Sequence, residues 1–248
     1  APVRFGDWEL NFDADGHLGD CRFRGVSHGP IAQVMFREEH GTMWTEEYGP
    51  GRHFVAPKAE SVDAVKRDGK ALTVITSYYE DRFRKFWPGL ARVRYRKELT
   101  FVAASPWVRV AIVLDILGNS TEVALRWGGD AMPQHECRAE IPLGSVVRHA
   151  CIPHAVQGDV FPALNFVAGD GFGVLNSGTP GHALRDGRLE TLLLRSPVKR
   201  WSPWFPVTPT ETMWDNGPRC YELVYGAESA GGMGAWHRAG MEFNGRLA

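Results

Sequence analysis

The sequence has no marked excess of charge of either sign and no long apolar run. Lys and Arg number 28 against 29 Asp and Glu, which leaves a formal net charge of −1. This balance provides no electrostatic attraction to nucleic acid or to an anionic membrane, so we expect neither as a partner. No apolar stretch approaches the roughly 20 residues that a membrane-spanning helix needs. The sequence does not identify a compartment; we expect a soluble protein, in the cytoplasm of a bacterium.

Closely spaced cysteines are also lacking. The four cysteines, Cys21, Cys137, Cys151 and Cys220, lie far apart with no C-x-x-C spacing. This spacing favours buried free thiols over a zinc or redox motif, and one or two disulfides remain the alternative. The sequence starts at Ala1 without a charged and apolar leader. We therefore expect a mature product or an excised piece of a longer polypeptide.

Metal and nucleotide motifs are lacking as well. No H-E-x-x-H motif and no Walker loop is present. His149 and His154 flank Cys151, but Pro153 prevents the helical turn that would align them, and zinc usually needs three or four ligands. The glycine-rich stretch 169–173 is followed by no helix that could present its N-terminus to a phosphate. We therefore predict no metal and no dinucleotide in this chain.

The sequence is rich in alternating apolar and polar residues, the pattern of half-buried strands. Strands are predicted over 71–80, 91–103 and 107–117, and shorter ones within 8–12, 137–144, 171–178, 188–197, 219–227 and 239–248. Asp-Gly pairs precede two of them, as at hairpin turns, and turn signals recur about every ten residues. The pattern predicts an all-β fold, a large antiparallel β-supersandwich of one domain spanning 1–248. The proline-rich stretch 196–218 has no periodicity, which is typical of a functional loop or an interface.

Residues 78–97 combine seven basic residues with six aromatic ones. Such a mixture is typical of single-stranded nucleic-acid binding. Arg92, Arg94 and Arg96, however, alternate with Val93 and Tyr95, as on a strand with one solvated face. We favour the solvated face.

Carboxyl groups for glycoside chemistry are plentiful but not paired by any spacing rule. A retaining glycosidase needs two carboxyls about 5–5.5 Å apart, a relation that only the folded chain displays. The candidates are Glu38, Glu39, Glu46, Glu47, Glu80, Asp81, Asp159 and Asp215. The nine tryptophans include candidate platforms for sugar rings, although most tryptophans in proteins lie in the core.

Seven segments, taken in order, resemble a known family. They are "DADGHLGD" (13–20), "EEHGTMWTEEYGPG" (38–51), "SPWVRVAIVLDILGNSTEVALRW" (105–127), "AEIPLGSVVRHA" (139–150), "FPALNFVAGDGFGVLNSGTPGHALRDGRLETLLLRSP" (161–197), "PRCYELVYGA" (218–227) and "EFNGRLA" (242–248). Together they resemble the C-terminal β-domain of class II α-mannosidases, glycoside hydrolase family 38. The segment with "VLNSG" and "LETLLLRSP" is the most specific of them.

The resemblance implies a galactose mutarotase-like β-supersandwich packed behind a (β/α) barrel. In that family the barrel carries the nucleophilic aspartate and the zinc ligands, and none of its motifs occurs here. We therefore expect this chain by itself to lack the nucleophile and the metal site. The implied partners are that upstream catalytic barrel, holding zinc or another divalent metal, and an α-mannoside-like glycan. The chain would support the barrel and lend loops to its sugar pocket.

Five residues are the candidates for contact with the glycan or the barrel: Arg148, Asn176, Arg195, Trp204 and Asp215. Arginine and asparagine groups bridge neighbouring sugar hydroxyls, and tryptophan stacks on the C–H face of a ring. A structural role is the competing interpretation, with Arg195 and Asp215 paired and Trp204 in the core.

Two other functions stay open. A stand-alone mutarotase-like protein that binds or isomerises a sugar would need a histidine and a carboxylate on one concave face. His135, Glu136, His149, His154, His182 and His237 are the residues available for it. A lectin-like or assembly module is the third possibility, favoured by the tryptophan content.

Overall fold

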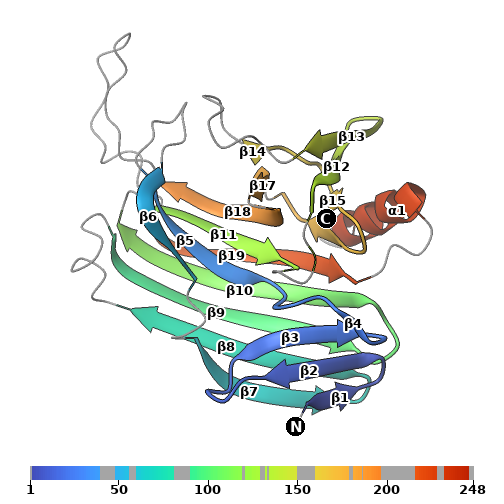
Figure 1. Ribbon diagram of the computed structural model, residues 1–248, viewed down its shortest axis with the longest axis horizontal. Coiled ribbons are helices and arrows are strands. Elements are labelled where there is room, and N and C mark those ends of the chain that lie inside the picture. Colours follow the sequence, from blue (N-terminus) through green and yellow to red (C-terminus); the bar gives the residue numbers. More distant parts are fainter. Residues whose placement is uncertain are drawn as a thin grey trace.

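A computed structural model describes most of the chain. The described residues are 2–39, 48–55, 60–80, 90–118, 121–128, 132, 134–149, 160–178, 181–185, 187–196, 216–227 and 232–245. Within these ranges the strands form three antiparallel sheets of four, nine and six strands, and one helix follows the last strand (Figure 1). The prediction of an all-β fold with large antiparallel sheets is confirmed.

The largest sheet, with nine described strands, runs across the whole molecule. In spatial order it contains β13 (Gly144–His149), β12 (Glu136–Ile141), β15 (Phe166–Ala168), β16 (Gly173–Asn176), β19 (Gly217–Gly226), β10 (Trp107–Gly118), β9 (Leu90–Val102), β8 (Ala71–Glu80) and β7 (Ser61–Asp68). The long strands β8, β9 and β10 coincide with the three long strands predicted from alternation. The Asp68-Gly69 turn joins β7 to β8, with Gly69 at a φ of +51°, as the hairpin signal predicted.

Two smaller sheets cover one face of the nine-stranded sheet (Figure 1). The six-stranded sheet contains, in spatial order, β14 (Val160–Phe161), β17 (Gly181–Arg185), β18 (Arg188–Ser196), β11 (Thr121–Trp127), β5 (Gln33–Glu39) and β6 (Tyr48–Val55). The four-stranded sheet contains β1 (Val3–Phe5), β2 (Trp8–Phe12), β3 (Leu18–Phe23) and β4 (Val26–Ser27). The first of these lies over β10 and β19, and the second lies over β7 to β9.

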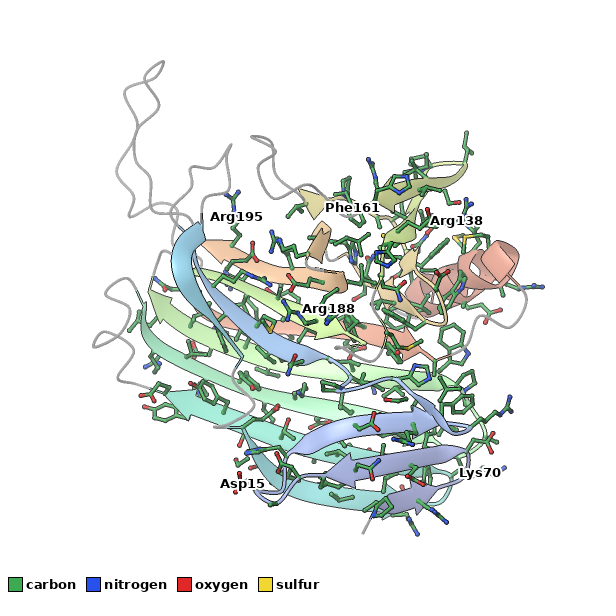
Figure 2. The ribbon with its side chains drawn as sticks, viewed as in Figure 1. Asp15, Lys70, Arg138, Phe161, Arg188 and Arg195 are labelled. Carbon is green, nitrogen blue, oxygen red and sulfur yellow. The ribbon has the colours of Figure 1, made fainter. Side chains whose placement is uncertain are left out.

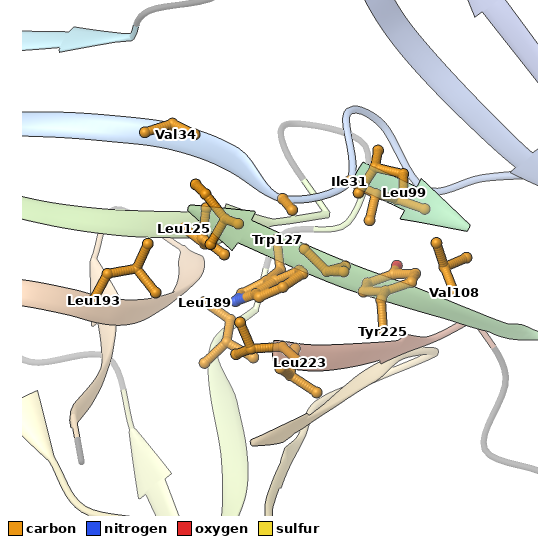
Figure 3. Packing of buried hydrophobic residues seen from close by; sticks show 14 of the residues in the cluster. Ile31, Val34, Leu99, Val108, Leu125, Trp127, Leu189, Leu193, Leu223 and Tyr225 are labelled. Atoms are coloured by element: carbon orange, nitrogen blue, oxygen red, sulfur yellow. The ribbon is translucent and has the colours of Figure 1, made fainter. Parts of the chain in front are cut away.

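The core lies between these layers. The Trp8 ring packs on Phe101 with ring centroids 5.1 Å apart, which joins the four-stranded sheet to β9. Figure 3 shows the six-stranded sheet meeting β19, where Trp127 stacks on Tyr225 at 6.0 Å. Because residues from all three sheets belong to one buried cluster, the layers share one hydrophobic core.

Strand β9 accounts for the end of the basic and aromatic stretch 78–97, of which residues 81–89 lie outside the described residues. Val93, Tyr95 and Lys97 face the core, whereas Arg94 and Arg96 are exposed on the other face. The predicted solvated face is therefore confirmed. Lys97 is the exception among the basic residues, since it is 4% exposed.

The C-terminal end corrects one prediction. Residues 239–248 were expected as a strand, but α1 (Gly232–Gly245) is a helix that covers 239–245. Met233, Trp236, Gly240 and Phe243 recur at the three- and four-residue spacing of a helical stripe. Met233, Trp236 and Phe243 pack with Phe166 and Leu175 in a separate small cluster. A strand would have placed Trp236 and Phe243 on opposite faces, so burial of this stripe selects the helix.

Candidate functional site

The glycine-rich stretch before β17 accommodates an aromatic ring. Gly173 on β16 lies opposite Gly226 on β19. A Cβ atom added to either glycine would lie 2.6 Å from the ring of Trp236, far inside van der Waals contact. These glycines let helix α1 seat its tryptophan on the sheet, and they form no phosphate cradle.

The six-stranded sheet carries a group of buried charges, which we call the Arg/Glu cluster. It consists of Arg37 on β5, Glu122 and Arg126 on β11, Arg185 on β17 and Glu190 on β18. The strand registers place Glu122 beside Arg37 and Glu190 beside Arg126. The alternate residues of β11, such as Val123 and Trp127, face the hydrophobic core, so the cluster occupies the other face of the sheet.

Short contacts connect all five side chains. Arg37 donates to Glu122 at 3.0 Å and also to Glu190. Arg185 donates to Glu122 at 2.5 Å and to Glu190 at 3.4 Å. Arg126 donates to Glu190 at 3.0 Å. Both carboxylates therefore have guanidinium partners, and each arginine of the pair Arg37 and Arg185 bridges the two.

Burial governs the electrostatics of the cluster. Both glutamates are fully buried, and Arg37 is 3% exposed. Burial lowers the pKa of Arg37, but the carboxylates of Glu190 and Glu122 outweigh it and raise the pKa above its ordinary value. Arg37 therefore keeps its charge, and the carboxylates of Glu122 and Glu190 accept its hydrogen bonds. The cluster holds the four neighbouring strands β17, β18, β11 and β5 together, and it places three arginines on this face of the sheet.

Arg195 is the predicted residue that the fold brings beside this cluster. It is half-buried on β18, and its register partner on β11 is Glu122 (Figure 2). Arg148 lies elsewhere, on β13, with its guanidinium carbon 5.7 Å from the centroid of the Phe161 ring. Trp204 and Asp215 lie outside the described residues. The predicted contacts of these four residues remain predictions.

Asn176 is fully buried in β16 and belongs to a chain of hydrogen bonds. Its Oδ1 accepts from the Gly178 N–H at 3.3 Å, and its Nδ2 lies 3.2 Å from Nε2 of His182. Nδ1 of His182 lies 3.0 Å from Oγ1 of Thr191, which also accepts from Trp127 Nε1 at 2.9 Å. This pattern assigns a neutral His182 with its proton on Nδ1. A glycan could reach Asn176 only if the side chain left these partners.

The described ligand-type side chains offer one compact group, Asp13, Asp15 and His17, whose ligand atoms lie within 4.8 Å of one another. Oδ1 of Asp13 accepts the backbone N–H of Asp15 at 2.9 Å and of His17 at 2.8 Å. The turn itself therefore brings the three together, and their proximity does not indicate a metal. His149 faces Glu136 at 3.6 Å on the surface. Cys151 and His154 lie outside the described residues.

The carboxyl candidates are placed only in part. Glu80 ends β8, and Glu38 and Glu39 end β5. The other five, Glu46, Glu47, Asp81, Asp159 and Asp215, lie outside the described residues. The buried acids Glu122 and Glu190 were not among the candidates. A single acid within an otherwise apolar strand, as in "TEVALRW" and "RLETLLL", was the signal that could have identified them.

Residues 25–29, "GVSHG", match the G-x-S-x-G pattern of serine hydrolases. Ser27 ends the short strand β4, and its hydroxyl donates to Asp20 at 2.6 Å. His28 points into the core, where its Nδ1 lies 2.8 Å from the Tyr225 hydroxyl. The strand–turn–helix geometry of a nucleophile elbow does not occur here, so the match has no catalytic meaning.

Comparison with solved structures identifies the fold. The chain aligns over its full length with a protein in glycosyl hydrolase family 38 from Enterococcus faecalis, at a TM-score of 0.75 and 10% identity. The chain also aligns over its full length with an α-mannosidase from Enterococcus faecalis V583, at the same TM-score and identity. A galactose mutarotase-related enzyme from Lactobacillus acidophilus aligns with 92% of the chain at a TM-score of 0.46 and 7% identity.

The fold is shared with part of the two Enterococcus faecalis proteins. The chain spans about a third of their length, 32% and 31% respectively. No protein-family model matches the sequence, and no curated protein matches it either. Within the described part of the chain, no helix has the length and apolar character needed to cross a membrane.

Proposed function

We propose that this chain is the C-terminal β-sandwich portion of an α-mannosidase-like retaining glycoside hydrolase. The observation that carries the proposal is the alignment of this whole chain with two Enterococcus faecalis proteins, one of them an α-mannosidase, at a TM-score of 0.75. The chain equals 32% of the length of the first, which leaves room for a separate catalytic domain in such a protein. The ordered sequence segments support the same assignment.

In this proposal the chain buries the flank of an upstream catalytic barrel and lends loops to the sugar pocket. The barrel supplies the carboxylate nucleophile, the acid and a divalent metal, zinc or another, that binds sugar hydroxyls. The Arg/Glu cluster rigidifies strands β5, β11, β18 and β17. Arg195 is then held beside the cluster, where we expect it to contact a glycan or the barrel.

The test uses the purified chain and a longer polypeptide that includes the upstream coding region. The chain is incubated with p-nitrophenyl α-D-mannopyranoside, with and without zinc. We expect no turnover from the chain and metal-dependent turnover from the longer polypeptide. Turnover by the chain itself contradicts the proposal, as does an upstream region that encodes no barrel.

A sugar-isomerising protein is the second candidate, favoured by two carboxylates and three arginines on one sheet face. Such a protein needs a histidine on the same face as the carboxylates. His182 does not meet this requirement, because it lies on the core side of its strand, next to Thr191. Polarimetry distinguishes the two functions. If the purified chain accelerates the interconversion of hexose anomers, the isomerase is correct; no acceleration rules it out.

A further inference from the structure

A cavity of about 130 Å³ lies beneath the loop that joins β2 to β3. Its walls come from this loop (13–19), from residues 30–33 before β5, and from the core-facing side of β8 and β9. In Figure 1, β3 crosses in front of β8 and β9 at this place, and Figure 2 labels Asp15 in the loop. The cavity is separate from the Arg/Glu cluster, because no member of that cluster lines it.

A buried ion pair forms part of the cavity wall. Nζ of Lys97 on β9 lies 2.8 Å from Oε1 of Glu60, and the exposed fractions of the two side chains are 5% and 12%. Thr76 on β8 donates to the same oxygen at 2.6 Å. Nζ of Lys97 also donates to the carbonyl of Ala32 at 3.1 Å. Two buried charges are costly to desolvate, so a pair that lines a cavity indicates a function there.

Hydrogen-bonding capacity remains on this wall. An ammonium has three donors, and Lys97 makes two contacts among the described residues. The contacts of Lys97 and Thr76 to the Glu60 carboxylate both fall on Oε1, and the hydroxyl of Tyr95 also lies near this carboxylate. Nδ1 of His17 is buried without a hydrogen-bond partner. Buried polar atoms are normally satisfied, so these groups indicate a polar occupant.

The charges on the wall select the chemistry of that occupant. An anion would meet the carboxylates of Asp13 and Glu60, and a cation would meet the ammonium of Lys97. A neutral hydroxyl accepts from Lys97 and donates to Glu60, so it satisfies both. The apolar walls of Ile31 and Leu99 suit the C–H groups between hydroxyls.

We propose that this cavity is a binding site for a neutral polyol of the size of glycerol, or for the hydroxymethyl arm of a sugar. A cavity of about 150 Å³ admits benzene, so about 130 Å³ suits an occupant of this smaller size and not a whole hexopyranose. The site uses residues of this chain only, and it does not depend on a catalytic barrel.

The experiment follows isoleucine methyl resonances of the full chain by NMR during titration with methyl α-D-mannopyranoside and, separately, with glycerol. Ile31 lines the cavity, whereas Ile141 lies at the end of β12 and is 38% exposed. We expect a saturable shift at Ile31 with at least one of the two polyols and none at Ile141. No shift at Ile31, or equal shifts at both residues, overturns the proposal.

Matched variants test the recognition chemistry. Thr76→Val removes the hydroxyl that positions Glu60, and Thr73→Val makes the same change on the same strand, where Thr73 contacts Thr100 instead. We expect Thr76→Val to weaken polyol binding about tenfold and Thr73→Val to leave it unchanged. Lys97→Met should weaken polyol binding at least about tenfold, whereas the control Lys66→Met, at an exposed site, should leave polyol binding unchanged. Valine has nearly the shape of threonine, so we expect Thr76→Val to fold. If Lys97→Met does not fold, the binding measurement on Thr76→Val still tests the proposal.

Ligand controls separate the remaining alternatives. Cyclopentane carries no hydroxyl, and we expect it not to shift Ile31. If it binds as well as the polyols, the cavity is an apolar one and the proposal is wrong. A saturable shift with sulfate or with calcium chloride, but not with the polyols, also overturns it.

Discussion

The guanidinium of Arg185 on β17 donates to the carboxylate of Glu122 on β11 at 2.5 Å, past the strand β18 that lies between them. Arg37 on β5 reaches in the opposite direction, past β11, to Glu190 on β18. The two arginines therefore link strands that are not adjacent: β17 is linked to β11, and β5 is linked to β18. This arrangement fixes the strand order as well as the pairing of adjacent strands.

Removing one charge from the cluster should destabilise the protein strongly. Glu190→Gln leaves Arg126 without its carboxylate partner and leaves Arg37 and Arg185 with Glu122 alone, and we expect a loss of about 3–5 kcal/mol in the free energy of unfolding. Glu222→Gln is the control, because that carboxylate pairs with Arg109 on the solvated face and should cost at most about 1 kcal/mol. Urea unfolding measures both. Equal losses in the two variants would mean that the cluster does not act as a buried network.

A methyl group at Gly173 should disturb the seat of helix α1. Gly173→Ala places a Cβ 2.6 Å from the Trp236 ring, and overpacking of this kind costs about 1–3 kcal/mol. Gly144→Ala is the matched control, since a Cβ there has no neighbour within 4 Å. The measurements are urea unfolding and tryptophan fluorescence. If Gly173→Ala is as stable as Gly144→Ala, Trp236 does not pack closely against Gly173.

The buried histidines should make the protein less stable in mild acid. Burial lowers the pKa of His182 from 6.5 to about 3, and burial likewise lowers the pKa of His28 to about 4, with the charge of Asp20 opposing it. Between pH 6.5 and these values the unfolded chain binds protons that the folded chain does not. Stability should therefore fall as the pH drops, by up to about 1.4 kcal/mol per pH unit for each histidine.

Urea unfolding at pH 7.5, 6 and 5 measures this dependence. In the His182→Gln variant, the slope of the unfolding free energy against pH should be smaller by the equivalent of about one proton between pH 6 and 5. An NMR titration in which His182 gains a proton above pH 5 would contradict the prediction.

The cysteines should differ in reactivity. Burial raises the pKa of Cys21 and of Cys137 to about 12, whereas Cys220 is exposed as a free thiol. We expect iodoacetamide to modify Cys220 in the native protein and to reach the two buried thiols only after unfolding. Peptide mass spectrometry locates the label. Native labelling of Cys21 at the rate of Cys220 would show that the core opens there.

Local pattern was sufficient for most strands. Alternation identified β8, β9 and β10 because the side-chain period of a strand is two residues and is visible in any short window. The same reading failed at α1, where "MEFN" alternates over four residues while Met233, Trp236 and Phe243 form a longer helical stripe. Which pattern prevails depends on what the segment packs against, here Phe166 and Leu175.

The candidate site was less accessible to sequence reasoning. Arg195 was among the candidates, but its neighbour Glu122 was not, because a lone acid within an apolar strand gives no indication of its partner. Asn176 was a candidate for ligand contact, and its observed partners are His182 and Gly178. The motif that contains Asn176 carries the resemblance to class II α-mannosidases, whereas the side chain itself is bonded within the core.

By itself the sequence determined the all-β class, the positions of the long strands, the hairpin at Asp68-Gly69 and the solvated face of β9. Each of these depends on residues close together in the chain. The tertiary structure decided that Arg37 meets Glu190, which is 153 residues away, that Gly173 makes room for Trp236, and that Lys97 lines a cavity. These relations depend on strand order and layer packing, and the burial of apolar surface by the whole chain selects both.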